Sequence, residues 1–397
     1  MAELSNRLNR LAPSATLAMS QKSNEMKAQG IDVINMSVGE PDFNTPEHIK
    51  EAGKKAIDDN FSKYSPVPGY MDLREAIVDK LKKENHLDYT TGEVIVGTGG
   101  KQGVCNTILA LVNPGDEVII PAPYWVSYPQ MTKLAGGTPV IVRAGFEQDF
   151  KMTAEQLEAV ITPKTKMLIL CSPSNPTGSV YSQEELNALA EVILKHEDIF
   201  VLSDEIYEHI NYVGKAASIA SYPGMKERTI ICNGVSKAYA MTGWRLGWVA
   251  APAWIVKGIN KLQGQYTSGT CDVSQKAAVA AYVASQDCVE QMRVAFERRR
   301  DLIVKLAKDI PGLEVNVPQG AFYLFPKCSS FFGKSDGETV INNSTDFAMY
   351  ILEKAHVATV GGDAFGDPDC FRMSYATSDD NIREAMRRIK EVLAVLK

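Results

Sequence analysis

Hydrophobic and polar positions follow two repeating patterns through the first two thirds of the chain. Short apolar runs, which are typical of buried strands, alternate with longer segments whose apolar residues recur at helical spacing. The runs lie at residues 94–96, 118–120, 139–142, 166–171, 199–202, 229–232 and 245–250. Because strands that alternate with helices usually pair in parallel under a cover of helices, the pattern predicts an α/β domain.

Helices are predicted before and between these strands. Capping boxes at Thr153 with Gln156 and at Ser182 with Glu185 mark two helix starts, because each side chain can satisfy a free backbone amide. Further helices are expected at residues 14–30, 46–59, 72–85, 101–112 and 125–135.

The pattern changes toward the end of the chain. Residues 252–310 are predicted to be helical. After them, short strands are expected at residues 313–317, 321–325 and 370–375, with helices at 344–356 and from 379 onward. This order predicts a smaller α+β domain. We therefore expect a large domain over residues 46–299 and a small domain that combines residues 1–45 with residues 300–397.

Composition supports a globular protein and excludes some functions. With 397 residues and 45% hydrophobic content, the chain can bury a large core. Its net charge of −6 gives no general attraction for nucleic acid or anionic lipid, so an anion has to be bound by a local site. We expect neither a nucleic-acid partner nor a membrane partner.

The cysteines and the amino terminus indicate the compartment. The 7 cysteines include no Cys-x-x-Cys pair and are interpreted as buried packing thiols in a reducing environment rather than as metal ligands. The first residues lack the apolar stretch of a signal peptide, and no later run approaches the roughly 18 apolar residues of a membrane span. We expect a cytoplasmic protein without a metal site.

Two turns at strand ends are candidate ligand sites. The segment Gly-Thr-Gly-Gly-Lys-Gln at residues 97–102 follows a strand and opens a helix, where free amides and the helix dipole can face a phosphate. A tight structural turn is an equal alternative. Asn175 lies between two prolines after the strand at 166–171, at the edge where ligands collect in parallel sheets. A helix-entry turn is the alternative there.

Four charged residues lie where a charge requires a partner. Asp204 follows an apolar strand and can pair with an arginine or with a cationic ring nitrogen. Lys237 has small neighbours, which suits either a partly desolvated Schiff-base lysine or an ordinary surface lysine. Arg245 can bind a phosphate or a buried acid. Arg372 lies inside an apolar strand, where a carboxylate of a substrate or of an internal aspartate is its natural partner.

Seven segments follow one another in an order and spacing that identify a family. They are Gly-Glu-Pro-Asp-Phe at 39–43, Gly-Gly-Lys-Gln at 99–102, Pro-Tyr-Trp-Val-Ser-Tyr-Pro at 123–129, Asn-Pro-Thr-Gly at 175–178, Ser-Asp-Glu-Ile-Tyr-Glu-His at 203–209, Ser-Lys-Ala-Tyr-Ala-Met-Thr-Gly-Trp-Arg at 236–245 and Arg-Met-Ser-Tyr-Ala-Thr at 372–377. Together they resemble class I aminotransferases of pyridoxal-phosphate (PLP) fold type I, in particular the bacterial aspartate aminotransferases. The resemblance implies a mostly parallel seven-stranded sheet between helices, a smaller α+β domain, PLP as cofactor and a homodimer with active sites at the interface.

The resemblance also implies roles around the cofactor. Lys237 would form a Schiff base with PLP and move the proton of the substrate Cα, while Asp204 would keep the ring nitrogen protonated. Asn175 and Tyr207 would hydrogen-bond the phenolic oxygen, and Trp125 would lie against the ring.

The remaining implied ligands hold the phosphate and the substrate. The phosphate ligands would be Gly99, Gly100, Lys101, Ser236, Arg245 and, from the neighbouring subunit, Tyr64. The substrate-binding residues would be Gly39, Trp125, Asn175 and Arg372, with Arg372 on the α-carboxylate, and Lys101 with Thr16 on a second carboxylate. Ala12 lies where some relatives have a basic residue, which argues against prephenate as a substrate.

The sequence therefore predicts an aspartate aminotransferase that moves the amino group of L-aspartate to 2-oxoglutarate with ping-pong kinetics. Lys237, Asp204 and Tyr207 would be its catalytic residues, and its partners would be small amino and keto acids. The alternatives are an aromatic, alanine or prephenate aminotransferase of the same family, a lyase that uses the same Schiff base, and a PLP-binding regulator without turnover.

Overall fold

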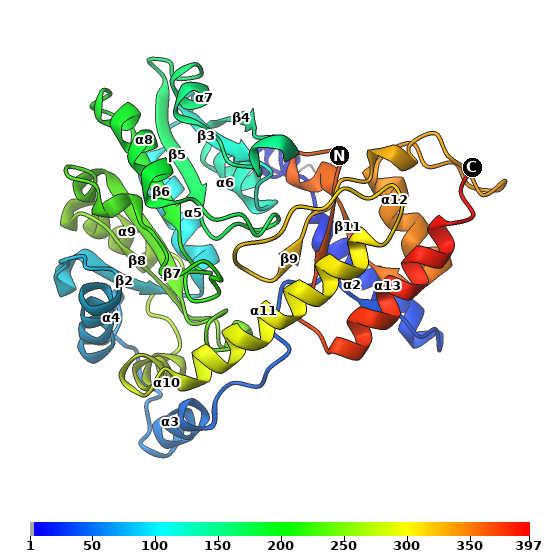
Figure 1. Cartoon of the computed structure of the whole chain (residues 1–397). Helices are drawn as coiled ribbons and strands as arrows, with labels where there is room; N and C mark the ends of the chain where they lie inside the picture. The colour runs from blue at the N-terminus through cyan, green and yellow to red at the C-terminus, as the bar shows by residue number, and fades with distance from the viewer. Residues whose placement is uncertain (1–3) are drawn as a thin grey trace.

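A seven-stranded sheet forms the centre of the larger part of the chain in the computed structural model, which describes residues 4–397 (Figure 1). In sheet order its strands are β2 (Val94–Gly97), β8 (Gly247–Ala250), β7 (Thr229–Gly234), β6 (Phe200–Asp204), β5 (Thr165–Cys171), β3 (Glu117–Ala122) and β4 (Thr138–Arg143). Neighbouring strands are parallel, except that β8 runs antiparallel to both β2 and β7. The predicted α/β class with a mostly parallel sheet is confirmed.

Helices cover both faces of this sheet. They are α3 (Glu47–Asp58), α4 (Met71–Glu84), α5 (Gly100–Leu111), α6 (Ser127–Ala135), α7 (Ala154–Glu158), α8 (Gln183–Leu194), α9 (Ala253–Gly264) and α10 (Asp272–Val283). Successive strand residues point to opposite faces, so Ile169 packs with α5, α6 and α9, whereas Leu168 packs with α7 and α8. The capping boxes at Thr153 and Ser182 are both formed, and they begin α7 and α8 as predicted.

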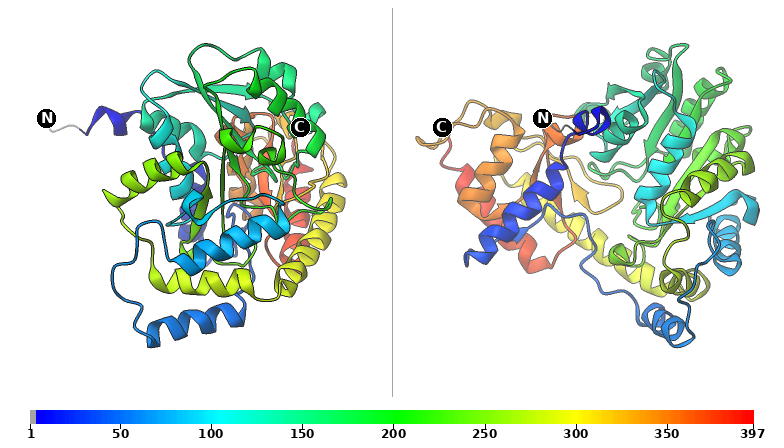
Figure 2. Two further views of the ribbon diagram at one scale, coloured as in Figure 1. Left: turned by 90° about the vertical axis from the view of Figure 1, so that its left-hand side faces the viewer. Right: turned by 180° about the vertical axis from the view of Figure 1, so that it is seen from behind.

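The rest of the chain forms a second unit with its own buried core. Its elements are α2 (Ala15–Ala28), α11 (Asp287–Lys308), α12 (Ser344–Tyr350), α13 (Asp379–Leu393), the pair β1 (Ile34–Asn35) with β10 (Val357–Ala358), and the three-stranded sheet β11 (Val360–Gly361), β12 (Phe371–Ser374) and β9 (Tyr323–Leu324). The amino-terminal α2 contacts β10 and β11 and lies beside the carboxyl-terminal part of the chain (Figure 1 and the right-hand view of Figure 2). Helix α11 runs unbroken across residue 299, so the expected domain boundary there stays a prediction.

Two local expectations were wrong, and one expected helix differs in type over its last turn. Residues 313–317 do not form a strand, because Val317 is 47% exposed and the segment makes only an isolated bridge between Glu314 and Lys327. The helix expected at 344–356 ends as an α-helix at Tyr350 and continues as one π-helical turn. Cys271 is exposed at the start of α10 rather than buried, although Cys232 and two other cysteines are buried.

All 7 cysteines are free thiols in the described structure. No helix within residues 4–397 is both long enough and apolar enough to cross a membrane.

Candidate active site

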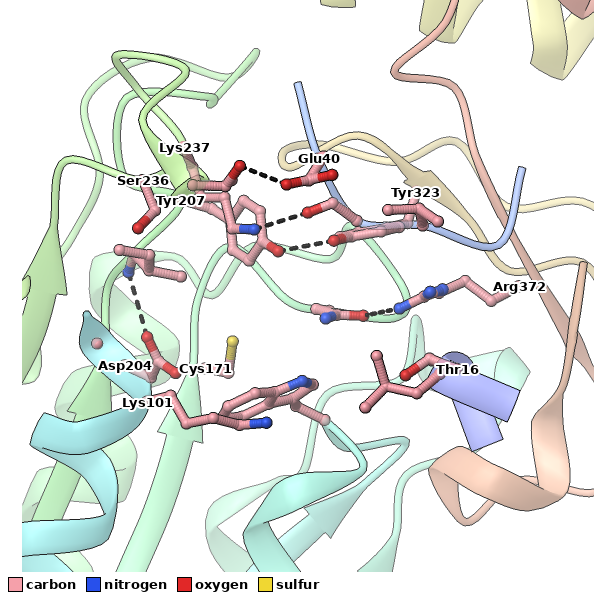
Figure 3. Close-up of a pocket in the computed structure, with 18 of the residues that line it drawn as sticks. Thr16, Glu40, Lys101, Cys171, Asp204, Tyr207, Ser236, Lys237, Tyr323 and Arg372 are labelled. Carbon is pink, nitrogen blue, oxygen red and sulfur yellow. Dashed lines mark hydrogen bonds between the residues drawn. The ribbon is translucent and has the colours of Figure 1, made fainter. Parts of the chain in front are cut away.

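A cavity of about 510 Å³ lies at the carboxyl ends of β5 and β6 and at the amino end of α5, and α2 and β12 close it from the other side (Figure 3). It brings together most of the residues predicted from the sequence, namely Thr16, Gly39, Gly100, Lys101, Trp125, Asn175, Asp204, Tyr207, Ser236, Lys237, Arg245 and Arg372. Parallel strands place their carboxyl ends at one edge of a sheet, which explains why Asp204 and the turn after β7 meet there.

Lys237 lies in the turn that follows β7. Its Nζ donates a hydrogen bond to the carbonyl oxygen of Gly39 at 2.7 Å. Burial lowers the pKa of Lys237 to about 8, the nearby Glu40 carboxylate opposes this shift, and Arg372 and Arg245 add to it. The amine is therefore neutral far more often than a surface lysine, which is the state that attacks an aldehyde.

Asp204 ends β6 and is 7% exposed. Its Oδ2 accepts a hydrogen bond from the Tyr128 hydroxyl at 2.7 Å, and its Oδ1 accepts one from the Ile206 amide at 3.3 Å. Burial raises the pKa of Asp204, and the bond from Tyr128 opposes the shift. Within residues 4–397 Asp204 forms no salt bridge, so the structural arginine partner that the sequence allowed is absent. The charge of Lys237 acts on Asp204 and lowers its pKa, against the effect of burial.

A cradle for an anion lies at the start of α5. Gly99 has a φ of 78°, and a Cβ placed on it would lie 2.6 Å from Nη2 of Arg245, so only glycine lets the guanidinium approach the helix amides. A Cβ on Gly247 would likewise collide with the Gly100 amide. Ser236, Lys101 and the free amides of this 12-residue helix face the same space.

Arg372 is buried in the middle of β12, with 2% of its surface exposed. Its Nη1 donates to Oδ1 of Asn175 at 2.8 Å, its Nη2 donates to the carbonyl oxygen of Ser37, and its Nε has no partner. Burial lowers the pKa of Arg372, and no carboxylate within the described chain pairs with it. A buried guanidinium with an unpaired donor indicates that its anion comes from a ligand.

Lys101 extends from the first turn of α5 across the face of Trp125, with Nζ 5.1 Å from the ring centroid. Desolvation at the cavity mouth lowers the pKa of Lys101, and the charge of Arg245 adds to the shift. Thr16 faces the cavity from α2, and its hydroxyl lies 2.9 Å from that of Ser14.

Two predicted residues do not line this cavity in the single chain. Gly99 lies directly behind it, against Arg245. Tyr64 is fully exposed, in a loop that Pro66 and Pro68 keep irregular. Its expected contact with a neighbouring subunit stays a prediction.

Among the lining residues that were not predicted from the sequence, four carry groups that can act in the site: Glu40, Tyr128, Cys171 and Tyr323. Tyr128 and Tyr323 occupy apolar periodic positions and cannot be told from core aromatics until their hydroxyls are seen to bond Asp204 and Tyr207. Glu40 lies in the segment Gly-Glu-Pro-Asp-Phe at 39–43, and its carboxylate accepts a hydrogen bond from the Thr242 hydroxyl at 2.5 Å.

Three potential metal ligands, Glu84, Glu208 and His209, lie close together outside the cavity. The Nζ of Lys80 contacts Glu208 and lies 3.6 Å from Glu84, so an internal ammonium already neutralises this buried charge.

The fold and this constellation define a PLP-binding enzyme of the aminotransferase class. The sequence model described as aminotransferase class I and II matches residues 31–389, and the chain belongs to that family. It is therefore a PLP-dependent aminotransferase.

Similar proteins include an aspartate/prephenate aminotransferase from Cereibacter sphaeroides, which is 49% identical over 399 residues covering 100% of both chains. An aspartate aminotransferase structure from Rhizobium meliloti has a TM-score of 0.97 and 42% identity, covering 100% of each chain. An aspartate aminotransferase from Thermus thermophilus with maleate has a TM-score of 0.93 and 40% identity, covering 99% of this chain and 100% of that one.

The residues present fit PLP in three independent places. Asp204 is buried without a salt bridge, the guanidinium of Arg245 closely approaches the start of α5, and burial lowers the pKa of Lys237. A pyridinium, a phosphate and an aldehyde on one molecule match these three needs.

Proposed function

We propose that the enzyme moves the amino group of L-aspartate to 2-oxoglutarate with ping-pong kinetics. The observation that carries this proposal is the pair of unpaired cations, Arg372 and Lys101, which line one cavity from opposite sides. Aspartate, oxaloacetate, 2-oxoglutarate and glutamate each carry two carboxylates, so each offers one anion to each cation. The names of the relatives support the same substrate class.

In this proposal the substrate is held at both ends. The Arg372 guanidinium binds the α-carboxylate, which the amide group of Asn175 and the backbone at Gly39 also contact. Lys101 binds the second carboxylate with help from Thr16. Closure of the small domain over the substrate would exclude water and strengthen these ion pairs.

Three residues act at the reacting atoms. PLP supplies a ring that accepts the electrons released when the substrate Cα loses its proton. Lys237 would hold the cofactor aldehyde and would then carry that proton, because burial removes its amine from water and lowers its pKa to about 8. Asp204 would keep a proton on the ring nitrogen, and Tyr207 would donate a hydrogen bond to the phenolic oxygen.

Other residues orient the cofactor. Trp125 would lie against the ring, and Asn175 can donate from Nδ2 because its Oδ1 already accepts from Arg372. The proposed phosphate ligands are Gly99, Gly100, Lys101, Ser236, Arg245 and Tyr64 of a second copy of the chain. A homodimer is therefore part of the proposal, and Arg245, exposed in the single chain, would be covered by it. The cytoplasmic location stays a prediction.

The attachment to Lys237 can be tested directly. Borohydride reduction of the PLP-loaded protein should fix the cofactor to the peptide that contains Lys237, as detected by mass spectrometry. The Lys237→Ala variant should lose the visible absorbance. Unchanged absorbance in that variant would rule out Lys237 as the attachment site.

Prephenate is the second candidate acceptor, because the Cereibacter sphaeroides relative is named for both aspartate and prephenate. The presence of Ala12 in place of a basic residue argues against it. Initial rates should be compared for aspartate, phenylalanine and alanine as donors, and for 2-oxoglutarate and prephenate as acceptors. A rate with aspartate far below the other donors would refute the proposed substrate.

A further inference from the structure

Tyr323, in β9, contacts three of the residues assigned to the cofactor and the substrate (Figure 3). Its hydroxyl lies 2.7 Å from the hydroxyl of Tyr207. Its ring centroid lies 4.6 Å from Cζ of Arg372. A Cβ placed on Gly39 would collide with its hydroxyl oxygen, so the glycine and the tyrosine are matched in size.

We propose that Tyr323 is a positioning residue that acts on both halves of the site. Its hydroxyl directs the proton of Tyr207 toward the cofactor, and its ring holds the guanidinium of Arg372 in place for the substrate carboxylate. This assignment rests on the proposed function and extends it.

The protons on the two hydroxyls decide which tyrosine donates to the other. Each phenol has one proton, and either oxygen of the Tyr207–Tyr323 pair can be the donor. If Tyr207 donated to Tyr323, Tyr207 would have no proton for the phenolic oxygen of PLP. Within residues 4–397 the Tyr323 hydroxyl has no other hydrogen-bond partner, so it is free to donate to Tyr207. An oxygen that accepts one hydrogen bond donates a stronger one, so Tyr323 strengthens Tyr207 as a donor.

Two aromatic rings contact the guanidinium of Arg372. Its Cζ lies 4.6 Å from the ring centroid of Tyr323 and 4.8 Å from that of Phe365. Cation–π contacts of this kind favour a cation in a site without water or a carboxylate. Because β9 pairs with β12, Ser374 opposite Tyr323 fixes the register between the ring and Arg372. The guanidinium is thereby held before a substrate arrives.

The first test removes the Tyr323 hydroxyl and keeps the ring. In the PLP-loaded protein without substrate, the pH midpoint of the absorbance change should rise by about 0.5–1 pH unit in Tyr323→Phe, the equivalent of losing one neutral hydrogen bond. Without the Tyr323 hydroxyl, Tyr207 is a weaker donor and leaves more negative charge on the phenolic oxygen. This charge holds the proton on the nitrogen that joins Lys237 to PLP, so that proton is lost only at higher pH and the midpoint rises.

Tyr375→Phe is the matched control. Its hydroxyl is also buried in the same core, 3.4 Å from the hydroxyl of Tyr212 and 3.2 Å from the carbonyl oxygen of Ala321, but it does not line the cavity. Its midpoint should equal that of the wild type. Equal midpoints in Tyr323→Phe and the wild type, or equal shifts in both variants, would overturn the role of the hydroxyl.

The second test removes the ring and uses maleate as a dicarboxylate probe. Tyr323→Leu should weaken maleate binding to the PLP-loaded protein by roughly 3- to 30-fold, as expected for loss of one cation–π contact, whereas Tyr323→Phe should bind maleate as tightly as the wild type. Binding can be titrated by absorbance, with folding checked by thermal melts. Equal affinities in the Leu and Phe variants would overturn the role of the ring.

These outcomes separate this assignment from the proposed function. A wild type that carries PLP on Lys237 but transfers no amino group from aspartate would refute the proposed substrate, and the absorbance test of Tyr323 would still decide its role. A wild type that transaminates aspartate with the same midpoint as Tyr323→Phe would overturn the hydroxyl assignment alone.

Discussion

Replacing Lys101 with methionine should separate recognition of the two substrate carboxylates. Methionine keeps the length of the side chain and its contact with Trp125, but it removes the ammonium that lies 5.1 Å from the ring. Arg372 and its bonds to Asn175 and Ser37 are left intact. The variant should therefore lose selectivity for dicarboxylates and keep recognition of the α-carboxylate.

The size of the loss follows from the surroundings of Lys101. An exposed ion pair contributes about 0.2–1 kcal/mol, whereas a hydrogen bond to a charged group contributes about 1.5–3 kcal/mol. Lys101 is solvent-exposed in the single chain, although one side is desolvated against Trp125. An intermediate value of about 1–2 kcal/mol corresponds to a fall of roughly 5- to 30-fold in kcat/KM for aspartate relative to alanine.

The assay compares kcat/KM for aspartate and alanine at saturating PLP, because Lys101 is also a proposed phosphate ligand. Arg372→Lys is the matched control. It loses the planar fork that binds any α-carboxylate, so it should reduce kcat/KM for aspartate and alanine by similar factors. An unchanged aspartate-to-alanine ratio in Lys101→Met would refute the assignment of the second carboxylate to Lys101.

Three further predictions concern the cofactor site. The neutral amine attacks the aldehyde, and burial lowers the Lys237 pKa to about 8. The rate at which the apoprotein takes up PLP, followed by stopped-flow absorbance, should therefore rise tenfold per pH unit below pH 8 and level off above it. A continued rise toward pH 10 would contradict this. Burial raises the folded pKa of Asp204 above its unfolded value, so ionised Asp204 destabilises the apoprotein above that unfolded pKa. Asp204→Asn should therefore raise the apoprotein Tm by about 1–3 °C at pH 7.5 and gain less from added PLP, and a lower apoprotein Tm would argue against this. Gly99 has a φ of 78°, and a Cβ on it would lie 2.6 Å from Arg245, so Gly99→Ala should lower the free energy of unfolding in urea by about 1–3 kcal/mol and weaken PLP binding. Gly145→Ala is the control, because a Cβ there meets nothing within 4 Å. Equal effects in both variants would exclude the clash.

The sequence was sufficient for the sheet because each strand is a separate apolar run bounded by turn residues. The capping boxes at Thr153 and Ser182 are equally local signals, and both formed. The segment at 313–317 misled because its alternation of apolar and polar residues matches a strand, whereas only Glu314 bridges to another segment and Val317 stays exposed. Local pattern cannot report such tertiary effects.

Some residues of the candidate site could be predicted from local sequence, and others could not. Asp204, Lys237 and Arg372 could be found because a charge next to an apolar run is unusual in any fold. Tyr128 and Tyr323 could not, because a buried tyrosine differs from a buried phenylalanine only in the partner of its hydroxyl. Those partners, Asp204 and Tyr207, are 76 and 116 residues away along the chain.

The reversed direction of β8 brings Arg245 to the edge of the sheet where Lys237 lies. In a fully parallel sheet the residue before a strand lies at the far edge, away from the ligand. Because β8 runs against β7, Arg245 at its beginning returns to the same edge as Lys237 just after the end of β7. Both ends of this connection are fixed by the sheet. In the proposed function Lys237 would hold the aldehyde and Arg245 the phosphate of one cofactor, so the pairing of β7 with β8 would set the distance between these two groups.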